Sequence, residues 1–316
     1  MNFNTWCFFA TNQKLDSQIC LKNDAHIILK DYGEYCEPMS FRMRDGHVYG
    51  IEVEALSKEQ ASDIVDVLCA CHTVVCGCYN ESSNEIVRRF DKDPSNWMTQ
   101  IGTQGIVYGD DALLHACILT QKVYGNQCFE NAVCKYYVAK EIYPLDPMEL
   151  HPLEDPFISD YLLSEQIKIT NVIVDCYAVL EELHLQIKVH ELNEKSSSIN
   201  DEWNPVVKAD LESRLSDKEI ETNKTLPWLT RNGNKRPFKS VVNKDTLCEW
   251  SDGQEVCDFE INICDAILEL SYMRSQLSSH KLDKKVLKLS VYDAENAFTL
   301  ARHLLLEYFK INPYKD

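Results

Sequence analysis

The stretch Asp265-Ala-Ile-Leu-Glu-Leu-Ser-Tyr-Met273 and its continuation Arg274-Ser-Gln-Leu-Ser-Ser-His280 decide the fold expected for the C-terminal half of the chain. The first part has the apolar spacing of a helix, and a second helical pattern follows over residues 293–308. Upstream, apolar residues predict a long helix over residues 159–191, which suits the spine of a bundle. We therefore expect residues 157–312 to form an all-α helical bundle.

Arg274 and His280 can meet only under one geometric condition. On one continuous helix their side chains would point about 240° apart. We expect the helix to end at Ser278 and Ser279, so that Arg274 projects from the last turn and His280 folds back beside it. A simpler alternative stays open, in which both residues are cations that the helix dipole favours at a C-terminus.

The pair combines two chemical capacities that neither residue has alone. The guanidinium of Arg274 can hold a phosphate through a charged fork, and the imidazole of His280 can move a proton near neutral pH. RNA carries a 2′-hydroxyl that can attack its own adjacent phosphate, which requires a base for that proton and an acid for the leaving oxygen. These residue types indicate metal-free cleavage of RNA, with His280 as base or acid and Arg274 stabilising the transition state.

An arginine and a histidine at this spacing, with a helix on each side, resemble the motif of the HEPN superfamily. The resemblance covers roughly residues 157–312, and Ser275 stands where many members have Asn, Asp or His. It implies a helical domain that commonly forms homodimers and acts as a metal-independent endoribonuclease in toxin or antiviral defence systems, without a cofactor. Other members are inactive, so the alternative is a non-catalytic module that binds a protein or nucleic-acid partner.

The formal net charge of −18 opposes non-specific binding of nucleic acid, because such binding depends on Lys and Arg neutralising phosphates. Residues 224–244 differ, since they contain several basic residues and no acid, and an uneven field of this kind can steer an anion. A solvated loop explains the same charges equally well. The residues that we expect to contact RNA are Lys281, Lys284, Arg231, Lys235, Arg236 and Lys239. The acidic remainder of the surface suits a protein partner.

Residues 1–150 are predicted to form a separate α+β and helical region, a sensor or a scaffold, so the whole chain is of the α+β class. Short apolar and alternating runs in the first ~55 residues predict strands. Ser57 and Gln60 have capping-box spacing and predict a helix over residues 58–72. A proline-rich stretch between residues 144 and 156 marks the expected domain boundary, and polar residues predict an irregular segment over 217–259.

Several cysteines and a histidine gather around the end of this first predicted helix. The candidates are Cys69, Cys71, His72, Cys76 and Cys78, which leave two interpretations open, a metal site or buried reduced thiols. A helix would point the thiols of Cys69 and Cys71 about 200° apart, which favours the second interpretation. The N-terminus lacks the pattern of a signal peptide and no apolar run approaches a membrane span, so we expect a cytoplasmic protein.

A few other polar and aromatic residues have the chemistry to join the site. Tyr272 and Tyr292 are able to stack on a nucleotide, although core aromatics are the more common case. Arg302 and His303 diverge by about 100° on a helix, so only one of them can face the motif. The Glu181 and His184 spacing occurs in di-iron bundles, but a second such pair is missing, and a solvated helix face is the better interpretation.

Overall fold

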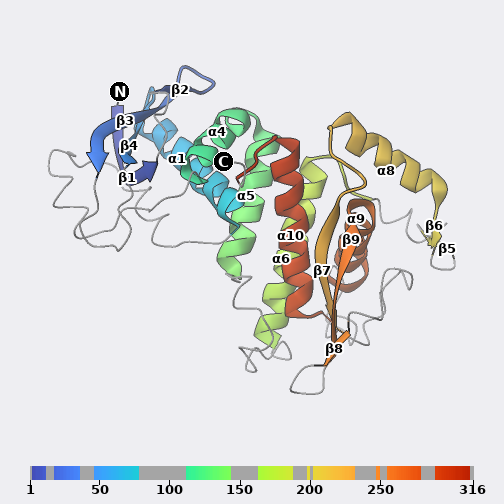
Figure 1. The fold of residues 1–316 in the computed structure, drawn as a ribbon. Coiled ribbons are helices and arrows are strands. Elements are labelled where there is room, and N and C mark those ends of the chain that lie inside the picture. Colours follow the sequence, from blue (N-terminus) through green and yellow to red (C-terminus); the bar gives the residue numbers. More distant parts are fainter. Residues whose placement is uncertain are drawn as a thin grey trace. The chain divides into compact units, whose positions relative to one another are not determined.

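The computed structural model describes residues 2–11, 18–35, 46–77, 112–143, 163–187, 198–199, 202–231, 247–249, 255–278 and 289–313. The chain divides into two compact units, Met1–Cys134 with Ile311–Asp316, and Lys135–Lys310. The predicted boundary between residues 144 and 156 lies outside the described residues. Each unit combines helices with an antiparallel sheet, so the fold is of the mixed α+β class (Figure 1).

The first unit contains an antiparallel sheet whose strand order is β1-β4-β3-β2. Its strands are β1 (Asn2–Thr11), β2 (Gln18–Cys20), β3 (His26–Tyr35) and β4 (Gly46–Glu54). Tyr49, Ile51 and Val53 alternate along β4 and are all buried, because successive side chains of a strand point to opposite faces. On the opposite face, Glu54 lies 3.3 Å from His26 of β3. The predicted strands of this region are confirmed.

Two helices of this unit have defined ends, and the first begins at the predicted residue but ends four residues after the predicted end at residue 72. Helix α1 (Lys58–Cys76) begins where Ser57 Oγ accepts a hydrogen bond from the Gln60 N–H at 3.2 Å, and Gly77 ends it with a φ of 78°. Helix α4 (Ala112–Val123) is followed by Gly125 at a φ of +76°. A Cβ at Gly125 would lie 2.8 Å from the side chain of Lys22, so a larger residue there would have to displace this lysine and also adopt a conformation that favours glycine.

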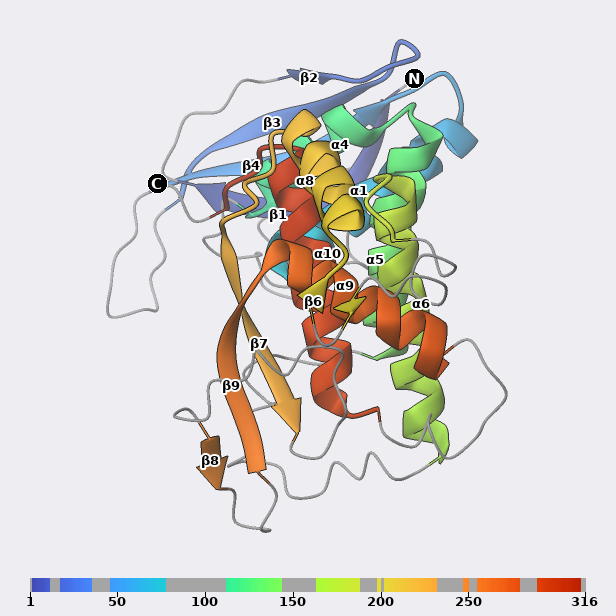
Figure 2. The ribbon, with the colours of Figure 1, turned by 90° about the vertical axis from the view of Figure 1, so that its right-hand side faces the viewer.

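The second unit is built on long helices that lie side by side. Helix α5 (Gln127–Ile142) contains the division between the units, and α6 (Leu163–Glu182) packs against α10 (Val291–Tyr308) (Figures 1 and 2). The shorter helices are α8 (Pro205–Asp217) and α9 (Ile263–Tyr272), and a π-helical turn η3 (Met273–Ser278) continues α9. None of the helices in the described ranges is long and apolar enough to span a membrane.

A cluster of aromatic and charged side chains joins three of these helices. The ring of Phe298 on α10 meets Tyr136 of α5 edge to face, with the ring centroids 5.9 Å apart. The ammonium of Lys140 lies 4.0 Å from the centre of the same ring, and its side chain is almost fully buried. Lys135 and Asp175 form an ion pair at 3.0 Å between α5 and α6. Phe298 of α10 therefore contacts two residues of α5, Tyr136 and Lys140.

The prediction of an all-α C-terminal half is wrong, because this unit also contains strands. Strands β7 (Thr225–Arg231), β8 (Leu247–Glu249) and β9 (Glu255–Asn262) form an antiparallel sheet in the order β7-β9-β8, beside α10 (Figure 2). A short pair, β5 (Ser198–Ile199) and β6 (Glu202–Trp203), precedes α8. Three stretches of the segment predicted to be irregular, residues 217–259, therefore lie in strands.

The outer edge of β7 is fixed to α10 by one buried amide. Asn296 Oδ1 accepts from the Leu229 N–H at 3.0 Å, and Asn296 Nδ2 donates to the Leu229 carbonyl at 2.6 Å. A side-chain amide thus takes the place of a neighbouring strand, which satisfies backbone groups that an edge strand otherwise leaves unpaired. Trp228, the next residue back along β7, is buried.

Candidate active site

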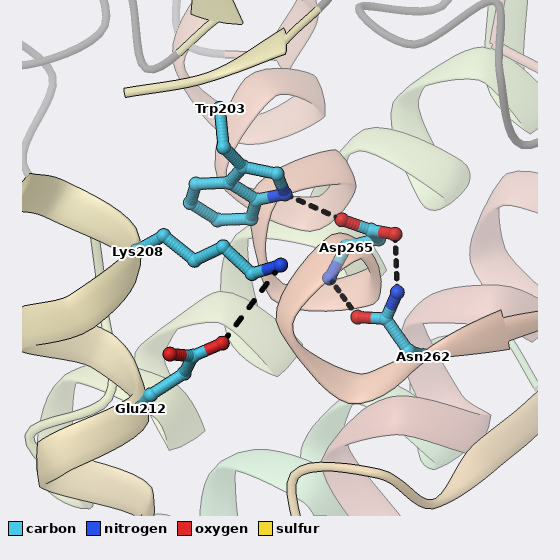
Figure 3. A network of polar contacts seen from close by, with 5 residues as sticks. All are labelled: Trp203, Lys208, Glu212, Asn262 and Asp265. Atoms are coloured by element: carbon cyan, nitrogen blue, oxygen red, sulfur yellow. Dashed lines mark hydrogen bonds and ion pairs between the residues drawn. The ribbon is translucent and has the colours of Figure 1, made fainter. Parts of the chain in front are cut away.

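Helix α9, which leads into the turn that carries Arg274, begins at a fixed point in the second unit. Asn262 caps α9, since its Oδ1 accepts from the Asp265 N–H at 3.0 Å and its amide also donates to the Asp265 carboxylate. Trp203 Nε1 donates to the same carboxylate at 2.5 Å, so β6 is tied to the start of α9 (Figure 3). The Asn262-x-x-Asp265 spacing is the sequence signal that marks this helix start.

Arg274 lies in the π-helical turn η3, not in the regular helix that the sequence predicts. Buried Ser275 donates its hydroxyl to the Ser271 carbonyl at 2.7 Å, and this carbonyl is the acceptor that an α-helical Ser275 N–H would use. Serine hydroxyls that bond back in this way compete with the helical ladder and distort it. Single π turns inside helices are frequent at functional sites.

The guanidinium of Arg274 contacts two residues of α6. It lies over the ring of Tyr177, with Cζ 5.1 Å from the ring centre, and its Nη2 lies 4.0 Å from Glu181 Oε1. Tyr177 is itself buried and donates its hydroxyl to the Ile187 carbonyl at 2.9 Å, so the ring beneath the guanidinium is fixed. The Arg274 side chain is 33% exposed and that of Glu181 is 46% exposed, so water and a dissolved anion can reach both.

Helix α6 ends nine residues before the predicted end at residue 191. His184 has a φ of 55°, the His184 N–H bonds to the Glu181 carbonyl, and the Leu185 N–H bonds to the Leu180 carbonyl. This pattern is a Schellman motif with histidine where glycine is usual, which is why the sequence does not reveal it. It leaves Glu181 in the last turn of α6, within reach of Arg274.

The other predicted site residues are described in part or not at all. His280, Lys281, Lys284, Lys235, Arg236 and Lys239 lie outside the described residues. Arg231 ends β7, where it pairs with Val256 of β9. Lys224 of the basic stretch forms an ion pair with Glu307 at 2.5 Å, which reduces the positive charge that it offers to a ligand. The structure thus brings Arg274 together with Glu181, a neighbour that the sequence does not pair with it.

The other aromatic and basic residues that were considered for the site differ in how deeply they are buried. Tyr292 is buried in the core, as the structural interpretation predicts, while Tyr272 is half-buried. Arg302 and His303 are both half-buried on α10. Burial, and next the positive charge of Lys224, lower the pKa of His303 to about 4, while Glu307 acts in the opposite direction. His303 is therefore neutral near pH 7.

Acidification should destabilise the folded chain through His303. Its pKa is about 4 in the folded state against an ordinary value of 6.5, so the unfolded chain binds the extra proton between these pH values. Stability therefore falls as the pH decreases from 6.5 to 4, by on the order of 2 kcal/mol from this residue. Urea midpoints at pH 4.5 and pH 7 should show a smaller difference in His303→Leu than in the wild type. A control, His184→Asn, should keep the wild-type difference; an equal difference in His303→Leu contradicts the prediction.

The cysteine cluster of α1 falls into two parts. Cys69 and Cys71 are buried, and burial raises the pKa of the Cys71 thiol well above its ordinary value. Cys76 is half-exposed, with Sγ 3.3 Å from His72 Nε2, and Cys78 lies outside the described residues. In the part of the chain that the structure describes, no three His, Cys, Asp or Glu side chains gather as a metal ion requires.

Comparisons with known proteins return no relative of this chain. A scan against protein-family models finds no match, and searches among curated proteins and among solved structures find no significant match. A functional assignment therefore depends on the residues of the chain and on their geometry.

Proposed function

We propose that the second unit is a metal-independent endoribonuclease of HEPN type, in which Arg274 and His280 are the catalytic pair. The observation that carries the proposal is the position of Arg274 in a π-helical turn, with its guanidinium half-exposed over a fixed tyrosine ring. Stacking on Tyr177 restricts the orientation of the guanidinium and leaves its donors able to bind a phosphate. A preorganised positive charge has its largest effect where negative charge develops in the transition state.

The proposed reaction uses the 2′-hydroxyl of RNA as the nucleophile. This oxygen attacks the adjacent phosphorus, the bond to the 5′-oxygen of the next nucleotide breaks, and a 2′,3′-cyclic phosphate forms. His280 transfers a proton in this step, either from the 2′-hydroxyl or to the leaving oxygen, and Arg274 stabilises the charge on the phosphate. In a homodimer, one His280 would act as the base and the other as the acid.

One exposed face of α6 supports the homodimer in this proposal. Leu163, Ile167 and Val174 are 54%, 48% and 40% exposed, and their spacing places them within about 40° of one another around the helix. Exposed apolar side chains on one stripe are typical of a surface that another molecule covers. Glu181 lies on the same stripe, five turns after Leu163, so a partner on this face would border the Arg274 site. A cytoplasmic location, and a role as a toxin or an antiviral effector, are part of the same proposal.

Glu181 controls access to Arg274 in this account, and its substitution is the experiment that tests the site. Glu181→Gln removes the carboxylate that lies 4.0 Å from the guanidinium, so RNA should bind several-fold more tightly and be cleaved faster at low RNA concentration. Exposed ion pairs contribute at most about 1 kcal/mol, which sets this modest size. Fluorescence anisotropy and gel assays in EDTA measure both effects.

Glu182→Gln is the matched control, because it makes the same change of charge one residue further along α6, about 100° around the helix. Equal effects of the two variants would mean that only the overall charge matters and would remove Glu181 from the site. Tighter binding of RNA without any cleavage would favour the second candidate function, a non-catalytic binding module. The net charge of −18 and the engagement of Arg274 by Glu181 are the observations in favour of that candidate.

A further inference from the structure

We propose that Cys76 and His72 of the first unit form a nucleophilic thiol–imidazole pair, a site of modification by hydroperoxides and other soft electrophiles. The two residues lie four apart on α1, so both side chains are on one face of the helix. Cys76 Sγ and His72 Nε2 are 3.3 Å apart, within hydrogen-bonding range for sulfur. This is the arrangement of nucleophile and base that activates a thiol.

Exposure distinguishes Cys76 from most of the other thiols that the structure describes. Burial raises the pKa of Cys117 and Cys264 to about 12, and it also raises the pKa of Cys71, Cys134 and Cys176. Such thiols stay protonated and unreactive near neutral pH. Cys76 is half-exposed beside the almost fully buried imidazole of His72, so a reagent can reach its sulfur while the base is held in place.

The position of Cys76 at the end of α1 makes the imidazole necessary for this reactivity. Cys76 is the last residue of the helix, and the Gly77 N–H bonds to the Thr73 carbonyl at 2.9 Å. The helix dipole is negative at this end, which disfavours a thiolate. Proton transfer from the thiol to His72 places a positive charge beside the sulfur and opposes that effect. Without the imidazole, Cys76 should be less reactive than an ordinary exposed thiol.

The reaction with a hydroperoxide needs no reactant other than the peroxide and these two residues. The Cys76 thiolate attacks one peroxide oxygen, a sulfur–oxygen bond forms and the oxygen–oxygen bond breaks. The leaving oxygen takes the proton that His72 received from the thiol and departs as water or an alcohol. Sulfur is oxidised by two electrons to a sulfenic acid, and the peroxide is reduced by the same two electrons.

Rates of labelling in the full chain test this proposal. The protein is treated with iodoacetamide at pH 7, or with hydrogen peroxide followed by dimedone, and each cysteine is quantified by peptide mass spectrometry. Cys128, which is exposed, is the reference within the same molecule. Cys76 should react about tenfold faster than Cys128, because the imidazole of His72 can take the proton of the Cys76 thiol. In His72→Gln, Cys76 should react more slowly than Cys128.

Two results would overturn the proposal. One is that Cys76 of the wild-type protein reacts no faster than Cys128, a comparison that needs no variant. The other is an unchanged rate at Cys76 in His72→Gln while buried Cys117 stays unlabelled, because protection of Cys117 shows that the first unit remains folded. If Cys117 becomes labelled in the variant, the wild-type ratio of Cys76 to Cys128 decides the question alone.

Discussion

Replacing His280 with alanine should reduce RNA cleavage by about 10³-fold, because general acid–base catalysis by one side chain contributes roughly 10²–10⁴. RNA binding should change little, since Arg274 and the basic residues remain. The measurement is the single-turnover cleavage rate of labelled RNA by the purified chain in EDTA, together with the thermal midpoint of the variant. A cleavage rate equal to that of the wild type would remove His280 from the reaction.

Arg274→Lys is the companion variant for this experiment. Lysine keeps the positive charge but loses the planar fork and the stacking on Tyr177, so cleavage should fall while the salt dependence of RNA binding stays similar. If Arg274→Lys keeps full activity while His280→Ala loses it, the arginine acts only through its charge. If neither variant loses activity, the pair has the structural role of cations at a helix end.

Phe298→Ala should destabilise the chain by about 3–5 kcal/mol, which is typical of removing a large buried aromatic side chain. The loss combines a cavity between α5 and α10 with the removal of the ring beneath Lys140, whose ammonium lies 4.0 Å from the ring centre. A buried ammonium that loses such a contact is costly. Urea unfolding followed by far-UV circular dichroism measures the free energy of unfolding for the second unit.

Phe298→Leu separates the two contributions, because it keeps most of the volume and removes the aromatic ring. We expect a smaller loss, about 1–2 kcal/mol. In a Lys140→Met background the penalty of Phe298→Leu should shrink, since no ammonium then depends on the ring. Equal penalties in the two backgrounds would show that the ring acts only through packing. A loss below about 1 kcal/mol for Phe298→Ala would contradict the central position of this residue.

Local signals in the sequence predict much of the first unit. Tyr49, Ile51 and Val53 alternate with polar residues and are buried on one face of β4. Ser57 and Gln60 define the start of α1 through a hydrogen bond between near neighbours. These features depend on residues close together in the chain, which is why spacing alone reveals them.

The strands of the second unit are hard to predict from the sequence for identifiable reasons. Pro227 lies within β7 and argues against a strand, but β7 is an edge strand, where a missing N–H is tolerated. In β9, Cys257, Phe259 and Ile261 alternate with Asp258 and Glu260, a period-two signal that the polar composition of the whole segment obscures. The polar composition of residues 217–259 as a whole therefore gives no sign of β7 and β9, which pair with each other.

In the candidate site, too, the sequence predicts features that depend on neighbouring residues and does not predict contacts between residues far apart in the chain. The sequence identifies Arg274 at the end of an apolar helix, and the structure places it in the π-helical turn that follows the last residue of α9, Tyr272. Its neighbours Tyr177 and Glu181 come from α6, far away in the chain, and helical spacing gives no register between two helices. The end of α6 depends on a histidine in a conformation that favours glycine, which leaves no sequence signal.

The cleavage of RNA by the wild-type chain in EDTA, with analysis of the product ends, tests the central claim most directly. Two matched oligonucleotides are compared, one of RNA and one with a 2′-deoxy sugar at the cleaved position. Because the proposed nucleophile is the 2′-hydroxyl, RNA should be cut to a 2′,3′-cyclic phosphate and the substituted oligonucleotide should stay intact at that position. Equal cleavage of both oligonucleotides, or no cleavage of any RNA tested in EDTA, would contradict the account.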